Sequence, residues 1–179
     1  MDPLTAADHR QIVETARSPA PAQGHCLCWD DEDETARFAA WLARQPGLRN
    51  ALLTLHGDLG AGKTTFARHL LRALGVAGRI KSPTYAVVEP HQAGDLAIWH
   101  FDFYRFSDPR EWEDAGFRDL FASPGLKLVE WPENAAGLLP TPDLAIYIEA
   151  EDDVRRHVTL HAATALGQTL IQALPSRDA

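Results

Sequence analysis

The stretch GDLGAGKTT, residues 57–65, constrains the fold of this chain more than any other feature of its sequence. It has the spacing G-x-x-x-x-G-K-[ST], and every fixed position is matched, by Gly57, Gly62, Lys63 and Thr64. The apolar run ALLTLH precedes it, and FARHLLRALG, with apolar residues at every fourth position, follows it. The sequence therefore predicts a buried strand, a phosphate-binding loop and a helix, in that order.

The residue types of this stretch match the chemistry of holding a phosphate. Glycines let the backbone curl so that several N–H groups point at the anion, and the positive end of the helix dipole faces the same charge. Lys63 supplies a point charge, and Thr64 offers a hydroxyl to Mg²⁺. A chance glycine-rich turn would explain a partial match, but not all fixed positions in this context. The residues expected to contact a nucleotide here are Gly57, Asp58, Leu59, Gly60, Ala61, Gly62, Lys63, Thr64 and Thr65.

Two carboxylates are the candidates to stand opposite the loop. Asp102 follows the run AIWHF and Glu130 follows LKLV, so each closes a mostly apolar strand, where burial of a charge is costly without a cation. One such ending could be a solvated strand end, whereas two in a chain with a phosphate loop favour a functional site. We expect Lys63, Asp102 and Glu130 to be catalytic and Thr64, Glu130 and Asp102 to hold the metal. The direct ligand among the two carboxylates is left open.

The segment KSPTY, residues 81–85, is predicted to be a loop because Pro83 disfavours helical geometry at Ser82. Its hydroxyls, above all that of Thr84, suit the sensing of a terminal phosphate or its magnesium, and an ordinary Ser-Pro turn is an equal alternative. His100 could face the site two residues before Asp102, but a packed core histidine is the favoured interpretation. Trp131 could pack over the site or meet a partner.

The remaining pattern predicts an α/β fold of the P-loop NTPase-like type. Strands are expected at 25–29, 51–56, 85–91, 95–104, 125–131, 143–150 and 156–162, with helices after residue 30, after the loop, in 109–121 and around 132–139. Because strands outnumber helices in the second half, we expect a mixed sheet with a parallel centre and antiparallel edge strands, flanked by helices.

Residues 1–24, with their prolines and alanines, are expected to be a flexible N-terminal extension, and residues 25–179 a single P-loop ATPase domain. No apolar run approaches the roughly 20 residues that cross a bilayer, and no secretory signal is present, which indicates a cytoplasmic protein without membrane contact. The net charge of −8, without a basic run, argues against an extensive nucleic-acid surface.

Several segments together resemble one family. GDLGAGKTTF, KSPTYAVVEP, HFDFYR and LVEWPE, with DPREWEDAG after HFDFYR, are similar to the TsaE family over roughly residues 30–160. The resemblance implies a Mg²⁺-dependent ATPase that is accessory to threonylcarbamoyladenosine synthesis, on the adenosine beside the tRNA anticodon. It implies TsaD and TsaB as partners, with tRNA contacted only indirectly. ATP and Mg²⁺ are the cofactors that it implies.

The resemblance also suggests individual roles. Lys63 and Thr64 would bind phosphate and magnesium, Glu130 would be a magnesium ligand, and Asp102 an essential acid near the terminal phosphate. Glu32 and Glu34 fall near the family's adenine contacts, and Arg155 falls at a late basic contact to nucleotide.

Two other functions remain open from the sequence. A small-molecule kinase or phosphotransferase would share the loop and magnesium but needs an acceptor pocket, which Arg105, Arg110 and Arg118 could line. A nucleotide-dependent assembly module would need no catalysis. The segment 108–121 is a candidate docking face, because it mixes charge with Trp112 and Phe117.

Overall fold

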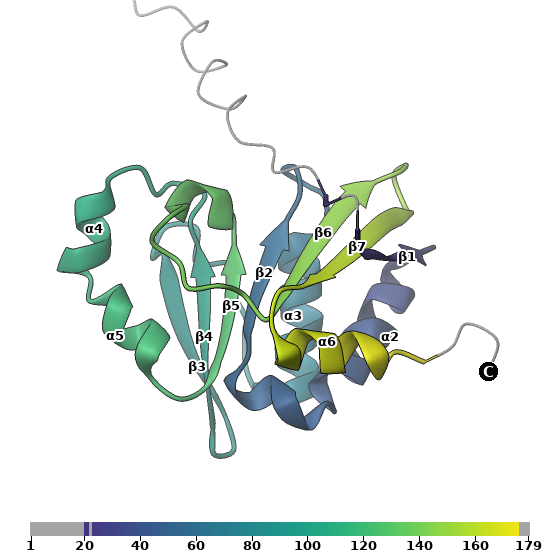
Figure 1. Ribbon diagram of the computed structural model, residues 1–179, viewed down its shortest axis with the longest axis horizontal. Helices are drawn as coiled ribbons and strands as arrows, with labels where there is room; N and C mark the ends of the chain where they lie inside the picture. The colour runs from purple at the N-terminus through teal and green to yellow at the C-terminus, as the bar shows by residue number, and fades with distance from the viewer. Residues whose placement is uncertain (1–19, 22, 176–179) are drawn as a thin grey trace, which may run out of the picture.

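A computed structural model describes residues 20–21 and 23–175, so most of the predicted extension 1–24 lies outside the described residues. The described residues form one seven-stranded sheet of order β1-β7-β6-β2-β5-β4-β3 (Figure 1). Its strands are β1 (His25–Trp29), β2 (Leu52–His56), β3 (Val88–Ala93), β4 (Leu96–Asp102), β5 (Leu126–Glu130), β6 (Leu144–Ala150) and β7 (Arg156–Ala162). The α-helices are α2 (Glu32–Ala43), α3 (Lys63–Leu74), α4 (Pro109–Asp114), α5 (Phe117–Ala122) and α6 (Ala165–Gln172), and the 3₁₀ turns are η1 (Pro46–Asn50) and η2 (Pro132–Ala135).

The centre of the sheet is parallel and its edges are antiparallel, as the sequence predicts. Strand β2 pairs in parallel with β5 and β6, and β5 pairs in parallel with β4. Strand β3 adds to β4, β7 adds to β6 and β1 adds to β7, all antiparallel. The carboxyl ends of the parallel strands therefore meet at one edge, the upper one in Figure 1.

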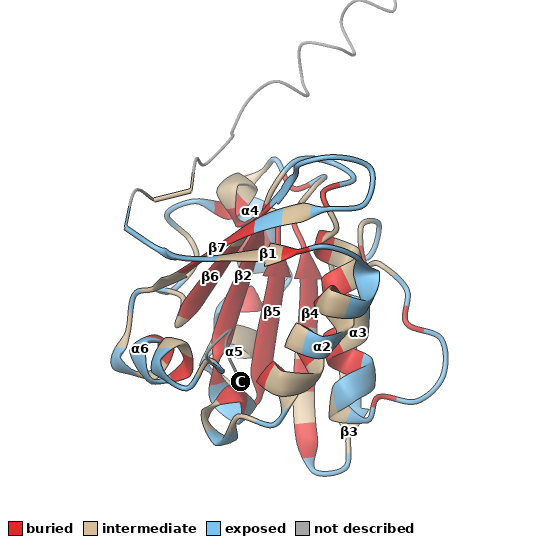
Figure 2. Cartoon of the chain, turned by 90° about the vertical axis from the view of Figure 1, so that its right-hand side faces the viewer, coloured by how far each residue is buried: buried red, intermediate tan, exposed pale blue. Residues whose placement is uncertain are grey.

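Two apolar cores cover the two faces of the sheet, because successive strand residues point to opposite sides. Leu53 and Leu55 of β2 pack with Phe66 of α3 and Leu42 of α2. Leu52 packs on the other face in an aromatic core with residues of β4, α4 and α5. Figure 2 shows the buried strands between helices that expose their outer faces. The rigid sheet between these cores is the support for the site at its edge.

The helix that follows the phosphate loop begins and ends at left-handed glycines. Gly62 precedes α3 with φ +114°, and Gly75 follows it with φ +99°. Helix α2 begins instead at Asp31, whose carboxylate accepts a hydrogen bond from the N–H of Glu34 at 2.8 Å.

Three differences from the sequence expectation have local causes. The segment 109–121 forms two short helices, because the chain turns at Gly116 with φ +67°. The strand expected from residue 85 begins at Val88, after a turn in which Val87 has φ +66° and its N–H donates to the carbonyl of Pro83. Helix α6 was not expected at all, since only eight residues form it.

The aromatic residues that suggested 108–121 as a docking face do not lie on the surface. Trp112 and Phe117 are buried, at 3% and 4% exposure, and both pack against Phe103. These two side chains form part of the apolar core under α4 and α5.

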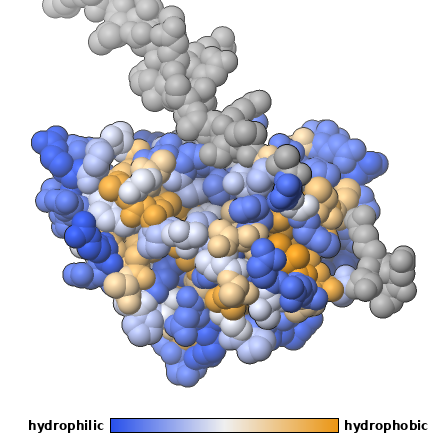
Figure 3. Space-filling model, viewed as in Figure 1, coloured by the Kyte–Doolittle hydropathy of each residue, from blue (hydrophilic) through white to orange (hydrophobic). Residues whose placement is uncertain are grey.

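In the face that Figure 3 displays, apolar residues form separate patches between hydrophilic ones. Within 20–21 and 23–175, no helix has the length and apolar character needed to cross a membrane.

Candidate functional site at the carboxyl edge of the sheet

The glycine-rich loop leaves β2 at this edge and turns tightly into α3. Gly57, Gly60 and Gly62 all have positive φ, at +140°, +80° and +114°, where other residues are strained. Gly57 also lies against β6, since a Cβ there would be 2.2 Å from the carbonyl oxygen of Ile148. In the described structure no side chain caps the N-terminus of α3, so its first N–H groups are oriented to bind an anion.

Lys63 lies folded into this loop and not out in solvent. Its side chain is 4% exposed, and its Nζ donates to the carbonyls of Gly57 at 2.5 Å and Asp58 at 2.9 Å. Burial lowers the pKa of Lys63 from its ordinary value, while the nearby carboxylates of Glu130, Glu133, Asp102 and Asp58 raise it. Four carboxylates around one lysine make the site electronegative, so a polyphosphate would need additional positive charge to enter it.

Trp131 covers the lysine. The Nζ of Lys63 lies 3.8 Å from the centre of the Trp131 ring, a cation–π contact, and Tyr104 packs on the same indole at 5.1 Å. Trp131 has φ +56°, a left-handed conformation that costs energy for a residue with a side chain. The prediction that Trp131 packs over the site is therefore confirmed.

Glu130 joins the loop helix to the neighbouring strand. Its Oε2 accepts a hydrogen bond from Oγ1 of Thr64 at 2.8 Å, and its Oε1 lies 2.8 Å from Nε2 of His100. Glu130 and His100 are 1% and 0% exposed. His100 is therefore buried, as the favoured interpretation had it, but it also contacts a site residue, which that interpretation did not include.

Asp102 is held by three donors from two loops. Its Oδ2 accepts from Oγ1 of Thr84 at 2.6 Å and Oγ of Ser82 at 3.1 Å, and its Oδ1 accepts from the N–H of Tyr104 at 2.9 Å. Asp102 is 2% exposed. The hydroxyls of the segment 81–85 thus hydrogen-bond this carboxylate, which fixes its orientation.

Strand register explains why two carboxylates that lie 28 residues apart in the sequence meet. Asp102 and Glu130 are direct partners in the parallel β4–β5 pair, so their side chains point to the same side of the sheet. That side carries α3, because Ile98 of β4 and Leu128 of β5 pack in the core with Phe66. Thr64, in the first turn of α3, therefore lies over the same edge.

A second buried cluster lies under the loop on the other face, and sequence reasoning missed it. Nδ1 of His56 is 3.0 Å from Oε1 of Glu133, its Nε2 is 3.0 Å from Oγ1 of Thr54, and its ring stacks on Tyr147 at 4.2 Å. His56 directly precedes Gly57, and Glu133 follows Glu130 by three residues. This closeness to the two motifs is the signal that could have singled them out.

A cavity of about 210 Å³ lies beside the loop, between α2, the start of α3 and the β6–β7 turn. This is smaller than the roughly 300–1,000 Å³ of pockets that enclose a whole drug-sized ligand. Glu32 lines it together with Trp29, Gly62, Thr65 and Val154. The carboxylate of Glu32 lies 2.9 Å from Nε2 of His69.

Glu34 lies outside this cavity lining and serves the start of α2. Its carboxylate accepts from the N–H of Asp30 at 3.2 Å and from Nη2 of Arg37 at 3.1 Å. The structure thus brings Glu32 to the loop, but Glu34 is occupied with the chain entering the helix.

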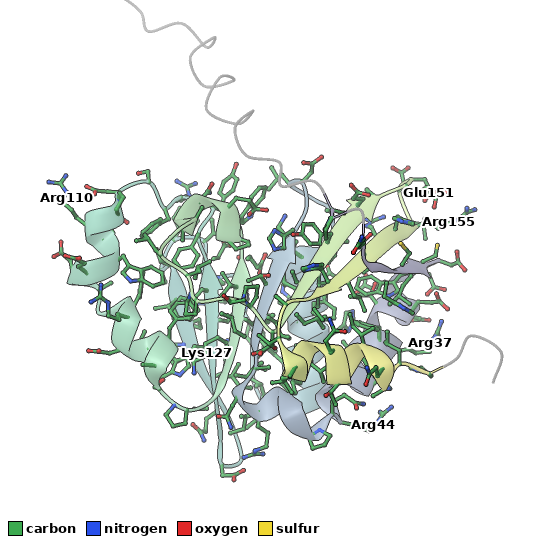
Figure 4. All side chains as sticks on the ribbon, in the orientation of Figure 1. Arg37, Arg44, Arg110, Lys127, Glu151 and Arg155 are labelled. Atoms are coloured by element: carbon green, nitrogen blue, oxygen red, sulfur yellow. The ribbon has the colours of Figure 1, made fainter. Side chains whose placement is uncertain are left out.

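The structure places Arg155 and its neighbour Arg156 differently relative to the loop. The side chain of Arg155 extends outward beside Glu151 (Figure 4), and it pairs with Glu151 at 3.6 Å and Asp152 at 3.9 Å. Arg156 instead donates from Nε to the carbonyl of Ala61 at 2.8 Å and lines the cavity beside the loop. Of the two arginines, Arg156 is therefore the one that contacts the loop.

The residues present suit a magnesium ion brought by a polyphosphate. Within the described part of the chain, no three His, Cys, Asp or Glu side chains form a complete metal cage. Mg²⁺ does not need one, since it takes oxygen ligands, keeps several waters and uses one or two carboxylates beside the phosphates. The hydroxyl of Thr64 next to Glu130, with Asp102 in register, is a donor set of this kind.

The fold and the site together define the P-loop fold class. The defining features are a buried parallel strand, a glycine-rich loop with its lysine, a helix without a side-chain N-cap, and two carboxylates on adjacent strands. Comparison with known proteins narrows the assignment from this fold class to a family. The family model described as threonylcarbamoyl adenosine biosynthesis protein TsaE matches residues 29–158, and the chain belongs to the TsaE family.

Relatives from distant bacteria agree with this. The chain is 42% identical over 137 residues to the tRNA threonylcarbamoyladenosine biosynthesis protein TsaE of Haemophilus influenzae, covering 76% of this chain and 86% of that protein. It is 37% identical to the protein of the same name from Bacillus subtilis, covering 80% and 85%. The crystal structure of Bacillus subtilis YdiB superposes with a TM-score of 0.65 at 29% identity, covering 85% of this chain and 95% of that one.

Proposed function

We propose that this protein is a Mg²⁺-dependent ATPase that is accessory to threonylcarbamoyladenosine synthesis on tRNA. Its partners would be TsaD and TsaB, which carry out the transfer itself, and its ATP hydrolysis would reset their complex between turnovers. The observation that carries the chemical part is the hydrogen bond from Thr64 to Glu130 beside the buried Lys63. The names of the relatives support the biological part.

The loop would exchange internal contacts for contacts to phosphate. Lys63 already lies between two loop carbonyls, and the same Nζ would turn to the terminal phosphates when nucleotide enters. The uncapped N–H groups at the start of α3 would bind the same anion. Loss of the charge in Lys63→Ala would therefore abolish nucleotide binding or turnover.

Thr64 and Glu130 would hold magnesium, which when bound neutralises part of the phosphate charge and polarises the phosphoryl group. Asp102 is rigidly held by Thr84, Ser82 and the Tyr104 N–H, so it suits the orientation of an attacking water near the terminal phosphate. Trp131 would cover the site and limit the access of bulk water. The cavity beside Glu32 would take the base or sugar of the nucleotide.

The acidic charge of the chain supports an indirect relation to tRNA. With a net charge of −8, it has no excess of cations to neutralise an RNA backbone, so contact with tRNA would run through the partner proteins. A cytoplasmic location follows from the same proposal, since tRNA is modified there.

Reconstitution tests the proposal. ATP loss would be measured for the protein alone, with TsaD and TsaB, and with TsaD, TsaB and tRNA, alongside tRNA modification. We expect stimulation by the protein partners, and we expect Lys63→Ala to remove both turnover and repeated rounds of modification. Unchanged ATPase activity of Lys63→Ala in the full complex would contradict the assignment of this loop as the nucleotide site.

The same assay with candidate metabolites distinguishes the proposed function from the phosphotransferase alternative. Stimulation by a metabolite and not by the proteins would replace the proposal with a small-molecule kinase. The arginines considered for an acceptor pocket give this alternative little support. Arg110 pairs with Asp108 at 2.7 Å and points away from the molecule (Figure 4), and Arg105 lies over the ring of Tyr85 at 4.4 Å.

The roles of the two carboxylates can be distinguished by how the activity of each variant depends on the Mg²⁺ concentration. Glu130→Gln should raise the Mg²⁺ concentration needed for activity more than Asp102→Asn, because Glu130 is the one that contacts Thr64. Asp102→Asn should reduce turnover at saturating Mg²⁺. A nucleotide-dependent assembly module without catalysis would instead keep tRNA modification intact in Asp102→Asn.

A further inference from the structure

His100 is a buried polar residue in contact with Glu130 that the comparisons give no role. Its ring is 0% exposed and its Nε2 lies 2.8 Å from Oε1 of Glu130. No polar partner in the described chain contacts its other nitrogen, Nδ1, which is also buried. The single polar contact of this imidazole is therefore the carboxylate.

The hydrogen-bond network places the ring proton on Nε2. A carboxylate that already accepts from Thr64 through Oε2 is an acceptor, so the imidazole must be the donor at Oε1. The bare Nδ1 is then an acceptor without a partner, which is less costly to bury than an N–H without one. The ring of His91 on β3 lies 6.3 Å from the His100 ring, measured between ring centres.

We propose that His100 is a positioning residue: its Nε2–H holds one oxygen of Glu130 so that the other stays directed at Thr64. This rests on the proposed function, in which Glu130 and Thr64 hold magnesium. Alternation along β4 places His100 and Asp102 on one side of the sheet, and its register places the ring beside β5. Residues that orient a metal-binding carboxylate in this way commonly affect metal affinity by about 10–100-fold when replaced.

The residue pattern of β4 argues against a purely space-filling role for this side chain. Ile98, two residues earlier on the same face, packs with Leu126 and Leu128 in the apolar core, so a leucine or phenylalanine at 100 would continue that pattern. His100 is in register with Leu128 of β5, and the next residue on that face of β5 is Glu130. The polar ring therefore stands where it can hydrogen-bond a carboxylate of the candidate site.

The test compares variants of the full chain that keep or remove the donor. His100→Gln keeps an N–H at the end of the side chain, and His100→Leu keeps the approximate volume without a donor. Mn²⁺ would replace Mg²⁺, and its affinity in the presence of ADP would be measured by electron paramagnetic resonance. The affinity for ADP would also be measured in a chelator, and thermal unfolding would follow the fold. His161→Gln, on β7 away from the site, is the control.

We expect His100→Leu to weaken Mn²⁺ binding by about 10-fold or more. His100→Gln should stay within about threefold of the unmodified protein, and ADP binding in the chelator should be the same in both. If His100→Leu does not fold, His100→Asn takes its place, because its N–H donor lies one bond nearer the backbone than Nε2 of His100 and does not reach Oε1 of Glu130.

Wild-type Mn²⁺ affinity in His100→Leu, or equal losses in the Leu and Gln variants, would overturn the positioning role alone. An unmodified protein that binds no Mn²⁺ with ADP would overturn the proposed function and this role together.

Discussion

The tight exit of the chain from β2 makes Gly57 the position where one methyl group should do the most damage. Replacement by alanine places a Cβ 2.2 Å from the carbonyl oxygen of Ile148, at a φ of +140°. Gly60, in the same loop, is the matched control. It also has positive φ, at +80°, but a Cβ there meets nothing within 4 Å.

The structure separates the two costs. Both alanines would carry the backbone strain of positive φ, about 1–2 kcal/mol. At Gly57 the atoms must also separate by about 0.8 Å to reach 3.0 Å, the shortest distance that a Cβ normally shows. The obstacle is backbone of β6, which is held in the sheet, so the displacement should add about 1–3 kcal/mol as other overpacked sites do. We expect losses of about 2–5 kcal/mol for Gly57→Ala and about 1–2 kcal/mol for Gly60→Ala.

Urea unfolding followed by circular dichroism would measure both free energies of unfolding, with a common slope as the check that the denatured states are comparable. The measurement needs no nucleotide, so any effect on binding stays separate. Equal losses for the two variants would refute the reasoning, because strain alone would then account for both.

Three further predictions concern the frame around the site. Trp112→Ala should lower the free energy of unfolding by about 3–5 kcal/mol because it empties a buried aromatic core, whereas Tyr85→Ala, 84% exposed, should change it by no more than about 0.5 kcal/mol in the same denaturation assay. Asp31→Ala should cost about 0.5–2 kcal/mol, read as a lower melting temperature, since it removes the acceptor for the Glu34 N–H. Burial lowers the pKa of Lys127 from its ordinary value of 10.5, so between the two values the unfolded chain holds the proton more tightly and stability rises with pH. The free energy of unfolding of the unmodified protein, taken relative to that of Lys127→Met, should therefore increase as pH rises toward 10.5, and a difference independent of pH would contradict this.

Local patterns were sufficient for most of the fold. The run at 51–56 became β2 and the four-residue repeat of Phe66, Leu70 and Leu74 became α3, because each pattern buries one continuous set of apolar side chains. The patterns were weaker where the chain is short or turns on single residues. Helix α6 and the break at Gly116 belong to this second group.

The candidate site was predictable as residue types, but its contacts were not. Asp102 and Glu130 could be singled out because a charge that ends an apolar strand is costly without a purpose. The hydroxyls of Ser82 and Thr84 could not be assigned to Asp102, since a loop sequence does not say which carboxylate it will reach. The family resemblance singled out Arg155, and the sequence alone could not show that the neighbouring Arg156 contacts the loop carbonyl of Ala61.

By itself, the sequence determined the phosphate loop, the strand and helix around it, the order of the strands along the chain and the family resemblance. These depend on residues that are close together in the chain. The tertiary structure alone decided that Glu130 meets Thr64 and His100, that Trp131 covers Lys63, and that His56 and Glu133 lie beneath the loop. Each of these pairs comes from separate segments, and the register and twist of the sheet, to which every strand contributes, bring them within hydrogen-bonding or van der Waals distance.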